Sequence, residues 1–203
     1  MKVLLGTHNP DKIREITDIL RAVDGLELTS NLPGMPDVIE DGDTIEANAI
    51  KKAVETAKAT GMPTLSDDTG LFVDALDGAP GVFAARYAGE GCTYADNRRK
   101  MLREMRGEFE RTACFRTVVA LADAGGLIGV AEGCVCGRIT QQERGEGGFG
   151  YDAIFLADET GRTFGQMTDA EKHAVSHRGR AFRTAIPMIA SYVTKRHTQE
   201  GEQ

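Results

Sequence analysis

Two neighbouring aspartates are the residues of this sequence best suited to catalysis. Asp67 and Asp68 belong to the run Ser66-Asp67-Asp68-Thr69-Gly70, which follows a short predicted strand at Thr64-Leu65. In an open α/β sheet, side chains at the end of a strand lie where ligands bind. Adjacent residues of an extended chain point to opposite sides, so we expect only one of the two carboxylates to face a ligand. The alternative is an Asx turn without a chemical role.

Other acidic residues of the chain are concentrated around this pair. The 203 residues include 24 basic and 31 acidic side chains, a net charge of −7, which argues against broad contact with a nucleic-acid polymer. Residues 37–77 alone hold ten acids and three lysines, and they account for the whole excess. Glu40, in a loop before a predicted helix, is the candidate second carboxylate, because Mg²⁺ takes one or two carboxylates together with substrate phosphates. The alternative is a solvated acidic surface.

The first loop of the chain is the candidate phosphate-binding site. It separates a predicted strand, 2–5, from a helix that has Asn9 at its N-cap and Pro10 at its first position. The backbone N–H groups at a helix N-terminus favour an anion. Thr7, Asn9 and Lys12 add a hydroxyl, an amide and a cation. The alternative is a capped helix with a surface lysine. The loop residues expected to bind the substrate are Thr7, His8, Asn9, Pro10, Asp11 and Lys12.

A glycine-rich segment, residues 144–152, is the candidate binding site for a nucleobase. Phe149 and Tyr151 offer aromatic rings for stacking, and Asp152 offers a carboxylate to the polar edge of a base. The alternative is a glycine-rich bulge with both aromatic rings in the core. Further along, Lys172 and the run Ser176-His177-Arg178 place cations ahead of the final predicted helix, whose N-terminal amides form another anion site.

These motifs are expected to be positioned by an α/β fold with a mixed central sheet, flanking helices and two lobes around a substrate cleft. Residues 1–196 are predicted to form one domain and residues 197–203 a frayed C-terminal tail. The remaining predicted elements are a helix over 43–60 with a capping box at Asp43 and Glu46, a helix over 96–105, a hairpin over 116–130, a strand over 153–156 and a helix over 178–193.

Cysteine usage and hydropathy bear on the compartment of the protein. The only close pair among the four cysteines (Cys92, Cys114, Cys134 and Cys136) is a C-x-C that lacks the second pair and the histidines of a zinc site. We therefore expect reduced thiols and no disulfide. No run approaches the roughly 18 apolar residues of a membrane helix, and the first apolar stretch is too short for a signal peptide, so a cytoplasmic protein without a membrane partner is expected.

Six motifs, in this order along the chain, resemble those of the inosine triphosphate pyrophosphatase family. Six ordered motifs are far more specific than any one of them, and the resemblance spans about residues 3 to 193. They are T-x-N-x-x-K at Thr7 to Lys12, E-x-N-A-x-x-K-A at Glu46 to Ala53, S-D-D-T-G-L at Ser66 to Leu71, G-A-P-G-V at Gly78 to Val82, G-G-F-G-Y-D at Gly147 to Asp152, and S-H-R at Ser176 to Arg178.

This resemblance implies a homodimer that hydrolyses the non-canonical nucleoside triphosphates ITP, dITP or XTP, with Mg²⁺, to the monophosphate and pyrophosphate. It also implies a role for each matched residue. Thr7, Asn9, Lys12, Lys52 and Lys172 contact the phosphates; Asp68 is the catalytic base and a metal ligand, with Glu40 as the other metal ligand; Thr69 contacts the substrate; Phe149, Gly150, Tyr151 and Asp152 hold the base; and His177 and Arg178 read the purine 6-oxo group.

Two residues depart from the family pattern, although neither change removes a proposed ligand. His8 stands where a small residue is common, and Ala153 replaces a proline. Two other functions are kept as alternatives: a related pyrophosphatase for pyrimidine or modified nucleotides, and a nucleotide-binding sensor without turnover.

Overall fold

The computed structural model describes residues 1–201, with side chains up to Arg196. The chain divides into two compact units, which agree with the two predicted lobes. Unit 1 comprises Met1–Asp68, Thr117–Gly133 and the C-terminal segment from Arg178, and unit 2 comprises Thr69–Arg116 and Cys134–His177. No helix of the described chain is long and apolar enough to span a membrane.

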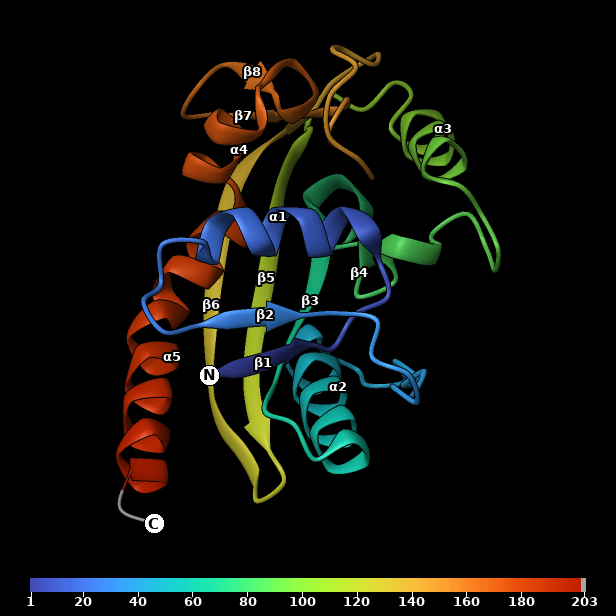
Figure 1. Cartoon of the computed structure of the whole chain (residues 1–203). Coiled ribbons are helices and arrows are strands. Elements are labelled where there is room, and N and C mark those ends of the chain that lie inside the picture. The colour runs from blue at the N-terminus through green and yellow to red at the C-terminus, as the bar shows by residue number, and fades with distance from the viewer. Residues whose placement is uncertain (202–203) are drawn as a thin grey trace. The chain divides into compact units, whose positions relative to one another are not determined.

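In residues 1–201, one mixed sheet and five α-helices make up the fold, so the predicted mixed-sheet α/β class is confirmed, while the helix over 169–175 was not predicted (Figure 1). The strands are β1 (Lys2–Leu5), β2 (Glu27–Thr29), β3 (Thr64–Val73), β4 (Pro80–Gly81), β5 (Thr112–Asp123), β6 (Gly126–Ile139), β7 (Phe155–Ala157) and β8 (Arg162–Thr163). The helices are α1 (Pro10–Leu20), α2 (Ile45–Thr60), α3 (Tyr94–Glu104), α4 (Asp169–Val175) and α5 (His177–Gly201). The strand order is β2-β1-β3-β5-β6-β7-β8, and β4 pairs with β3. Strands β3, β5 and β6 contribute residues to both units.

In unit 1, helices cover both faces of the sheet. Strands β1, β2 and β3 run parallel. The chain crosses from β1 to β2 through α1 and returns past β1 to β3 through α2, so right-handed crossovers put α1 and α2 on opposite faces. One core cluster joins Val3 and Leu5 of β1, Ile16 of α1 and Phe182 of α5, and α5 therefore shares the face of α1.

In unit 2, an aromatic core is built on the antiparallel part of the sheet. Strands β6, β7 and β8 pair antiparallel, as do β3 and β4. Phe115 of β5 lies 4.7 Å from Phe155 and 6.3 Å from Phe164, measured between ring centroids. All three rings are buried, and such packing of large rings is a main source of core stability.

The strand after α2 is much longer than predicted. It runs from Thr64 to Val73, so Asp67 and Asp68 lie inside a buried strand instead of following one. The predicted strand ends at Leu65, and the consecutive acids that follow argue against a buried strand. The structure satisfies both carboxylates with cations from elsewhere in the chain, as described below.

Several other elements differ from the prediction at their ends. Helix α2 begins at Ile45 with Thr44 as its N-cap, so the predicted capping box at Asp43 and Glu46 is wrong. Helix α5 continues to Gly201, beyond the predicted end at Val193. The tail predicted as frayed, 197–203, is therefore helical in its backbone up to Gly201, and its last two residues lie outside the described residues. The predicted hairpin is present as β5 and β6 with a turn at Ala124-Gly125.

The prediction of no disulfide is wrong for one pair of cysteines, because Cys114 and Cys136 are joined. They lie 22 residues apart on β5 and β6, which are neighbours in the sheet. The turn at Ala124-Gly125 folds β6 back along β5, and the Cα atoms of Cys114 and Cys136 lie 4.1 Å apart. The spacing of cysteines does not show such a pairing unless the register of the hairpin is known.

Replacing the cap of α2 tests which residue begins this helix. The Thr44 hydroxyl accepts a hydrogen bond from Ala47 N at 3.0 Å. We expect Thr44→Ala to lower the free energy of unfolding by about 1 kcal/mol in urea titrations, because one backbone N–H loses its acceptor. The neighbouring Asp43→Ala is the control and should lower the free energy of unfolding by less than half as much. A larger loss in Asp43→Ala would contradict this assignment.

Candidate functional site: a charged cluster in unit 1 and an aromatic loop in unit 2

A close approach of two strands holds the first loop beside the aspartates. Gly6 N donates to Leu65 O at 2.8 Å, and a Cβ atom on Gly6 would lie 2.2 Å from Ser66 Oγ. Only glycine fits between the end of β1 and β3 at this point. The loop that starts at Thr7 therefore begins next to the strand that carries Asp67.

Asp67 is the centre of a buried ion-pair network. Its side chain is fully buried, and its Oδ2 lies 3.2 Å from Lys12 Nζ and 3.2 Å from Arg178 Nη2. The second guanidinium nitrogen, Nη1, donates to Glu15 Oε2 at 2.7 Å. Burial opposes ionisation of Asp67, but the nearby Lys12 and Arg178 cations prevail and hold the pKa of Asp67 well below its usual range. Burial lowers the pKa of Lys12, against the attraction of Asp67.

Asp68 lies in a second cluster, contributed by α2 and the loop before it. Asp68 Oδ2 accepts from Asn48 Nδ2 at 3.2 Å, and Asp68 Oδ1 lies 3.4 Å from Lys52 Nζ. The same ammonium donates to Glu40 Oε1 at 2.5 Å and to Asp67 O at 2.7 Å. Burial raises the pKa of Asp68, against the attraction of Lys52, so this carboxylate is a stronger base than an exposed aspartate. For Lys52, the attraction of Asp68 and Glu40 outweighs burial and raises the pKa.

The prediction that neighbouring carboxylates point apart is met by these contacts. Asp67 binds cations from α1 and α5, which lie on one face of the sheet, and Asp68 binds residues of α2, which lies on the other. Because side chains alternate along β3, Asp67 and Asp68 belong to two different clusters of charged residues. Glu40 and Asp68, the predicted metal ligands, share one ammonium group and are brought together.

The donor set of this cluster fits Mg²⁺. Glu40 and Asp68 offer hard carboxylate oxygens, which magnesium prefers together with phosphate and water oxygens. In the network of the described residues, the three cations Lys12, Lys52 and Arg178 meet the four carboxylates Glu15, Glu40, Asp67 and Asp68.

The rest of the first loop is built as predicted for a helix N-terminus. The Asn9 side chain accepts from the backbone N–H of Asp11 at 2.9 Å and of Lys12 at 3.3 Å, and Pro10 occupies the first helical position. Thr7 Oγ1 accepts from Asn9 N at 3.2 Å. His8 is exposed, and Asp11 pairs with Arg14 at 3.0 Å. The alternative of a simple surface lysine is wrong, since Lys12 is bound to Asp67.

In unit 2, Asp152 fixes the glycine-rich loop. Its Oδ2 accepts from Phe149 N at 2.7 Å and forms a salt bridge with the buried Lys172. Gly148 has φ +71°, and a Cβ there would lie 2.0 Å from Asp152 Oδ2, so glycine is required for this turn. Lys172 Nζ also lies 4.7 Å from the centroid of the Phe149 ring. Asp152 and Lys172 thus hold the loop and its aromatic ring.

The two aromatic residues of this loop have different environments. Tyr151 is buried, and its hydroxyl donates to Ala84 O at 2.8 Å, so for this residue the alternative of a core position is confirmed. Burial raises the pKa of Tyr151 well above its usual value. Phe149 is partly exposed and tilted against Tyr94, with 5.7 Å between ring centroids. Gly150 O accepts from Arg98 Nη1 at 2.9 Å.

The predicted pair His177 and Arg178 is divided between the two units. His177 belongs to unit 2, where its buried ring stacks on Phe115 with 4.5 Å between ring centroids and 23° between their planes. Arg178 belongs to unit 1 and binds Asp67 and Glu15. Thr69, partly buried on β3, directly follows Asp68 and begins unit 2.

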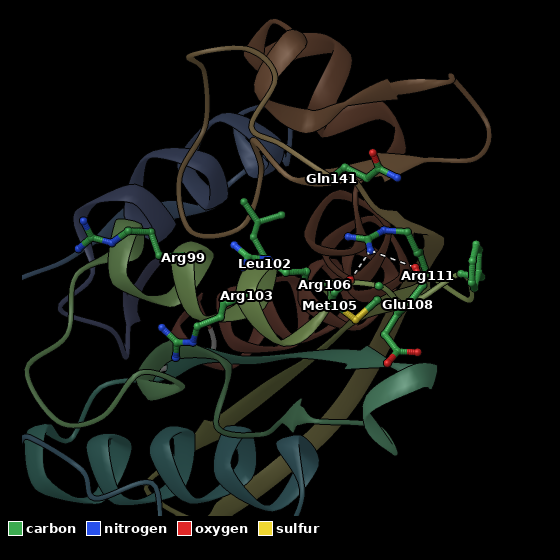
Figure 2. A pocket seen from close by; sticks show the side chains of 10 residues that line it. Arg99, Leu102, Arg103, Met105, Arg106, Glu108, Arg111 and Gln141 are labelled. Atoms are coloured by element: carbon green, nitrogen blue, oxygen red, sulfur yellow. Dashed lines mark hydrogen bonds between the residues drawn. The ribbon is translucent and has the colours of Figure 1, made fainter.

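A cavity of about 500 Å³ in unit 2 lies among residues outside the predicted site (Figure 2). Arginines on and after α3 line much of it, and none of the predicted site residues does. Arg111 is bound there to backbone carbonyls, at 2.6 Å to Ile139 O and 2.8 Å to Thr140 O. Burial lowers the pKa of Arg111. Its contacts tie the segment after α3 to the end of β6.

Two residues of the charged cluster were missed by sequence reasoning. Glu15 lies three residues after Lys12 and beside the buried Ile16, and this spacing was a signal that Glu15 faces inward. Asn48 lies one helical turn before Lys52, within the E-x-N-A-x-x-K-A motif. Asp67, to which the sequence analysis assigned no role of its own, pairs with both Lys12 and Arg178.

The fold and these contacts define a mixed-sheet α/β protein with a cation-paired carboxylate cluster at a strand-loop-helix unit. A family model described as the Ham1 family matches residues 3–188. The chain belongs to this family, and the family resemblance predicted from the six motifs is confirmed.

Curated relatives and a solved structure match nearly the whole chain. A protein of Geobacter sulfurreducens named dITP/XTP pyrophosphatase is 46% identical, covering 89% of this chain and 92% of that protein. A protein of Desulfotalea psychrophila with the same name is 41% identical, covering 98% and 91%. The structure of a HAM1 protein from Coxiella burnetii has a TM-score of 0.82 at 35% identity, covering 96% of this chain and 99% of that one.

Neutralising Asp67 tests the stabilising role of its network. Because the pKa of Asp67 is depressed in the folded state, its contribution is present above the unfolded-state pKa and is lost as the pH falls toward the folded-state value. We expect Asp67→Asn to lower the free energy of unfolding at pH 7 by about 3–5 kcal/mol. The difference from the wild type should shrink below about pH 4.

Urea unfolding followed by circular dichroism at several pH values measures this effect. Asp11→Asn is the matched control, since Asp11 pairs with Arg14 near the surface, and surface ion pairs contribute about 1 kcal/mol or less. A loss in Asp67→Asn that stays the same down to pH 2 would contradict the ionic role of Asp67.

Proposed function

We propose that this protein hydrolyses non-canonical purine nucleoside triphosphates, among them dITP, ITP and XTP, to the nucleoside monophosphate and pyrophosphate. The observation that carries the proposal is the cluster of Asp68, Glu40 and Lys52 in a member of the Ham1 family whose curated relatives are named dITP/XTP pyrophosphatase. Removal of such nucleotides from the pool is a house-cleaning role.

The phosphates are bound by the first loop and the buried lysines. Backbone N–H groups at the start of α1 provide hydrogen bonds to phosphate oxygens, with Thr7 and Asn9 beside them. Lys12 and Lys52, and in unit 2 Lys172, supply positive charge. Lys12 has a lowered pKa because of burial, and a bound anion would favour its charged form.

Asp68 acts as the general base. Its pKa is raised by burial, which makes it a better proton acceptor than an exposed aspartate. It orients a water and takes its proton as the water oxygen attacks the α-phosphorus in line, while pyrophosphate leaves. Asn48, which donates to Asp68 Oδ2, and Lys52, whose Nζ lies 3.4 Å from Asp68 Oδ1, hold the carboxylate in position.

Mg²⁺ is part of this proposal, held by Glu40 and Asp68. When bound, it would offset the negative charge of the phosphates and of the two carboxylates. The family resemblance further leads us to propose a homodimer and a cytoplasmic location.

The base is held by residues of unit 2. Phe149, positioned by Asp152 and Lys172, stacks on the purine, and His177 contributes to reading the 6-oxo group. Arg178, the other predicted reader, is proposed to contact the base while it remains bound to Asp67 and Glu15. An adenine 6-amino group would leave a buried donor without an acceptor, which costs about 1–3 kcal/mol per lost hydrogen bond.

A substrate panel with product identification tests the function. The protein is incubated with Mg²⁺ and ITP, dITP, XTP, GTP, ATP or dTTP, and the products are separated by ion-exchange chromatography. We expect monophosphate and pyrophosphate from the 6-oxo purines ITP, dITP and XTP, with at least about a tenfold preference over ATP, as one lost hydrogen bond predicts. Products limited to orthophosphate and diphosphate would overturn the reaction. Turnover of dTTP alone would favour a pyrimidine enzyme, and tight binding without products a sensor.

Removing the base tests the role of Asp68. Asp68→Asn keeps the volume and the contact with Asn48 but cannot take a proton, so we expect a loss of kcat by at least about a hundredfold with an unchanged fold. Asp74→Asn, an exposed acid of the same acidic stretch, is the control and should keep full activity. Circular dichroism and Tm report the fold. Retained activity in Asp68→Asn would place the base elsewhere.

A further inference from the structure

Three cysteines that the proposed function does not use come together in unit 2. Cys114 lies on β5, and Cys134 and Cys136 lie two residues apart on β6. Cys114 and Cys136 form the disulfide. The three Sγ atoms all lie within 4.8 Å of one another. A third sulfur is thus within reach of an existing disulfide.

The position of the cluster on the sheet makes it accessible. Side chains alternate along β6, so Cys134 and Cys136 share one face, and Val135 between them is buried in the core on the other. Cys136 is exposed, and Cys114 and Cys134 are partly exposed. Exposed disulfides are reduced more readily than buried structural ones and are commonly regulatory or catalytic.

We propose that Cys114, Cys134 and Cys136 form a redox-active thiol–disulfide site, in which Cys134 exchanges with the Cys114–Cys136 disulfide. The Cys134 thiolate attacks Cys114 Sγ, and a Cys134–Cys114 bond forms as the Cys114–Cys136 bond breaks. The electron pair of the broken bond leaves on Cys136 Sγ, which takes up the proton that Cys134 lost. No net oxidation occurs in this step. Its result is to move the thiol from a partly buried position to an exposed one.

The co-reactants of this site are low-molecular-weight thiols. Two such thiols reduce the intramolecular disulfide, giving two cysteine thiols and one small-molecule disulfide, through a mixed disulfide on a protein sulfur. The exposed Cys136 is the sulfur that such a thiol reaches most easily. This chemistry is independent of nucleotide hydrolysis, and its test does not use the enzyme activity.

Thiol mapping in glutathione buffers tests the proposal. The full-length wild type, Cys134→Ser and Cys136→Ser are equilibrated at low protein concentration across a range of reduced to oxidised glutathione. Each sample is quenched in acid and treated with N-ethylmaleimide, and its linkages are assigned by peptide mass spectrometry. A second aliquot is pulsed with iodoacetamide before the quench. Cys92→Ser removes a cysteine outside the cluster and is the matched control, and circular dichroism verifies that each variant is folded.

The expected pattern is specific to an exchanging site. Oxidised wild type should contain both the 114–136 and the 114–134 linkage, and Cys136→Ser should form the 114–134 linkage alone. The pulse should label Cys136 at least about tenfold more in oxidised wild type than in oxidised Cys134→Ser, which has no internal thiol to release it. Cys92→Ser should behave as the wild type.

Three results would overturn the proposal. One is that all three cysteines remain thiols in oxidised glutathione. Another is that Cys136→Ser forms no 114–134 linkage, which would leave Cys134 outside the chemistry. The third is that reduced protein takes up one Zn²⁺ per chain, loses this capacity in each serine variant of the cluster and forms no disulfide, which would make the sulfurs a metal site.

Discussion

The burial of Asp67 is the constraint on which unit 1 depends. An ionised carboxylate inside a protein is stable only when it is paired and hydrogen-bonded. Its partners, Lys12 and Arg178, come from α1 and α5. Both helices must therefore pack on the same face of the sheet, and the apolar cluster of Ile16 and Phe182 lies on that face. The same requirement fixes the start of α1, and with it the loop that we propose binds phosphate.

The proposed role of Asp68 as a base depends on the pairing of its neighbour Asp67 with other cations. The two residues differ by one step along β3, so one carboxylate faces the cations of α1 and α5 while the other faces α2. Asp67 has its pKa depressed by two cations, whereas Asp68 shares Lys52 with Glu40 and has its pKa raised by burial. Two adjacent residues of one strand thus have pKa values shifted in opposite directions, and the proposed assignment of Asp68 as the base depends on this difference.

Features that depend on residues close in the sequence were predicted, whereas features that depend on contacts between distant segments were not. The cap at Asn9 and the proline after it depend on residues within one helical turn, and both were predicted. The length of β3 and the disulfide depend on contacts between distant segments. A strand with consecutive acids is acceptable only once Lys12, Lys52 and Arg178 are placed, and two cysteines 22 residues apart pair only in one register of the hairpin.

The sequence predicted which residues form the site more fully than it predicted which of them pair with each other. Glu40 was chosen as a partner of Asp68 from its position alone, and the two carboxylates meet on one ammonium group. Arg178 was predicted to contact the purine base of the substrate, yet its guanidinium binds the carboxylates of Asp67 and Glu15. Glu15 belongs to none of the six motifs. Charge explains the difference. The net charge of −7 is concentrated in one stretch, which indicates that cations are needed near it. Only the fold shows which cation pairs with each carboxylate.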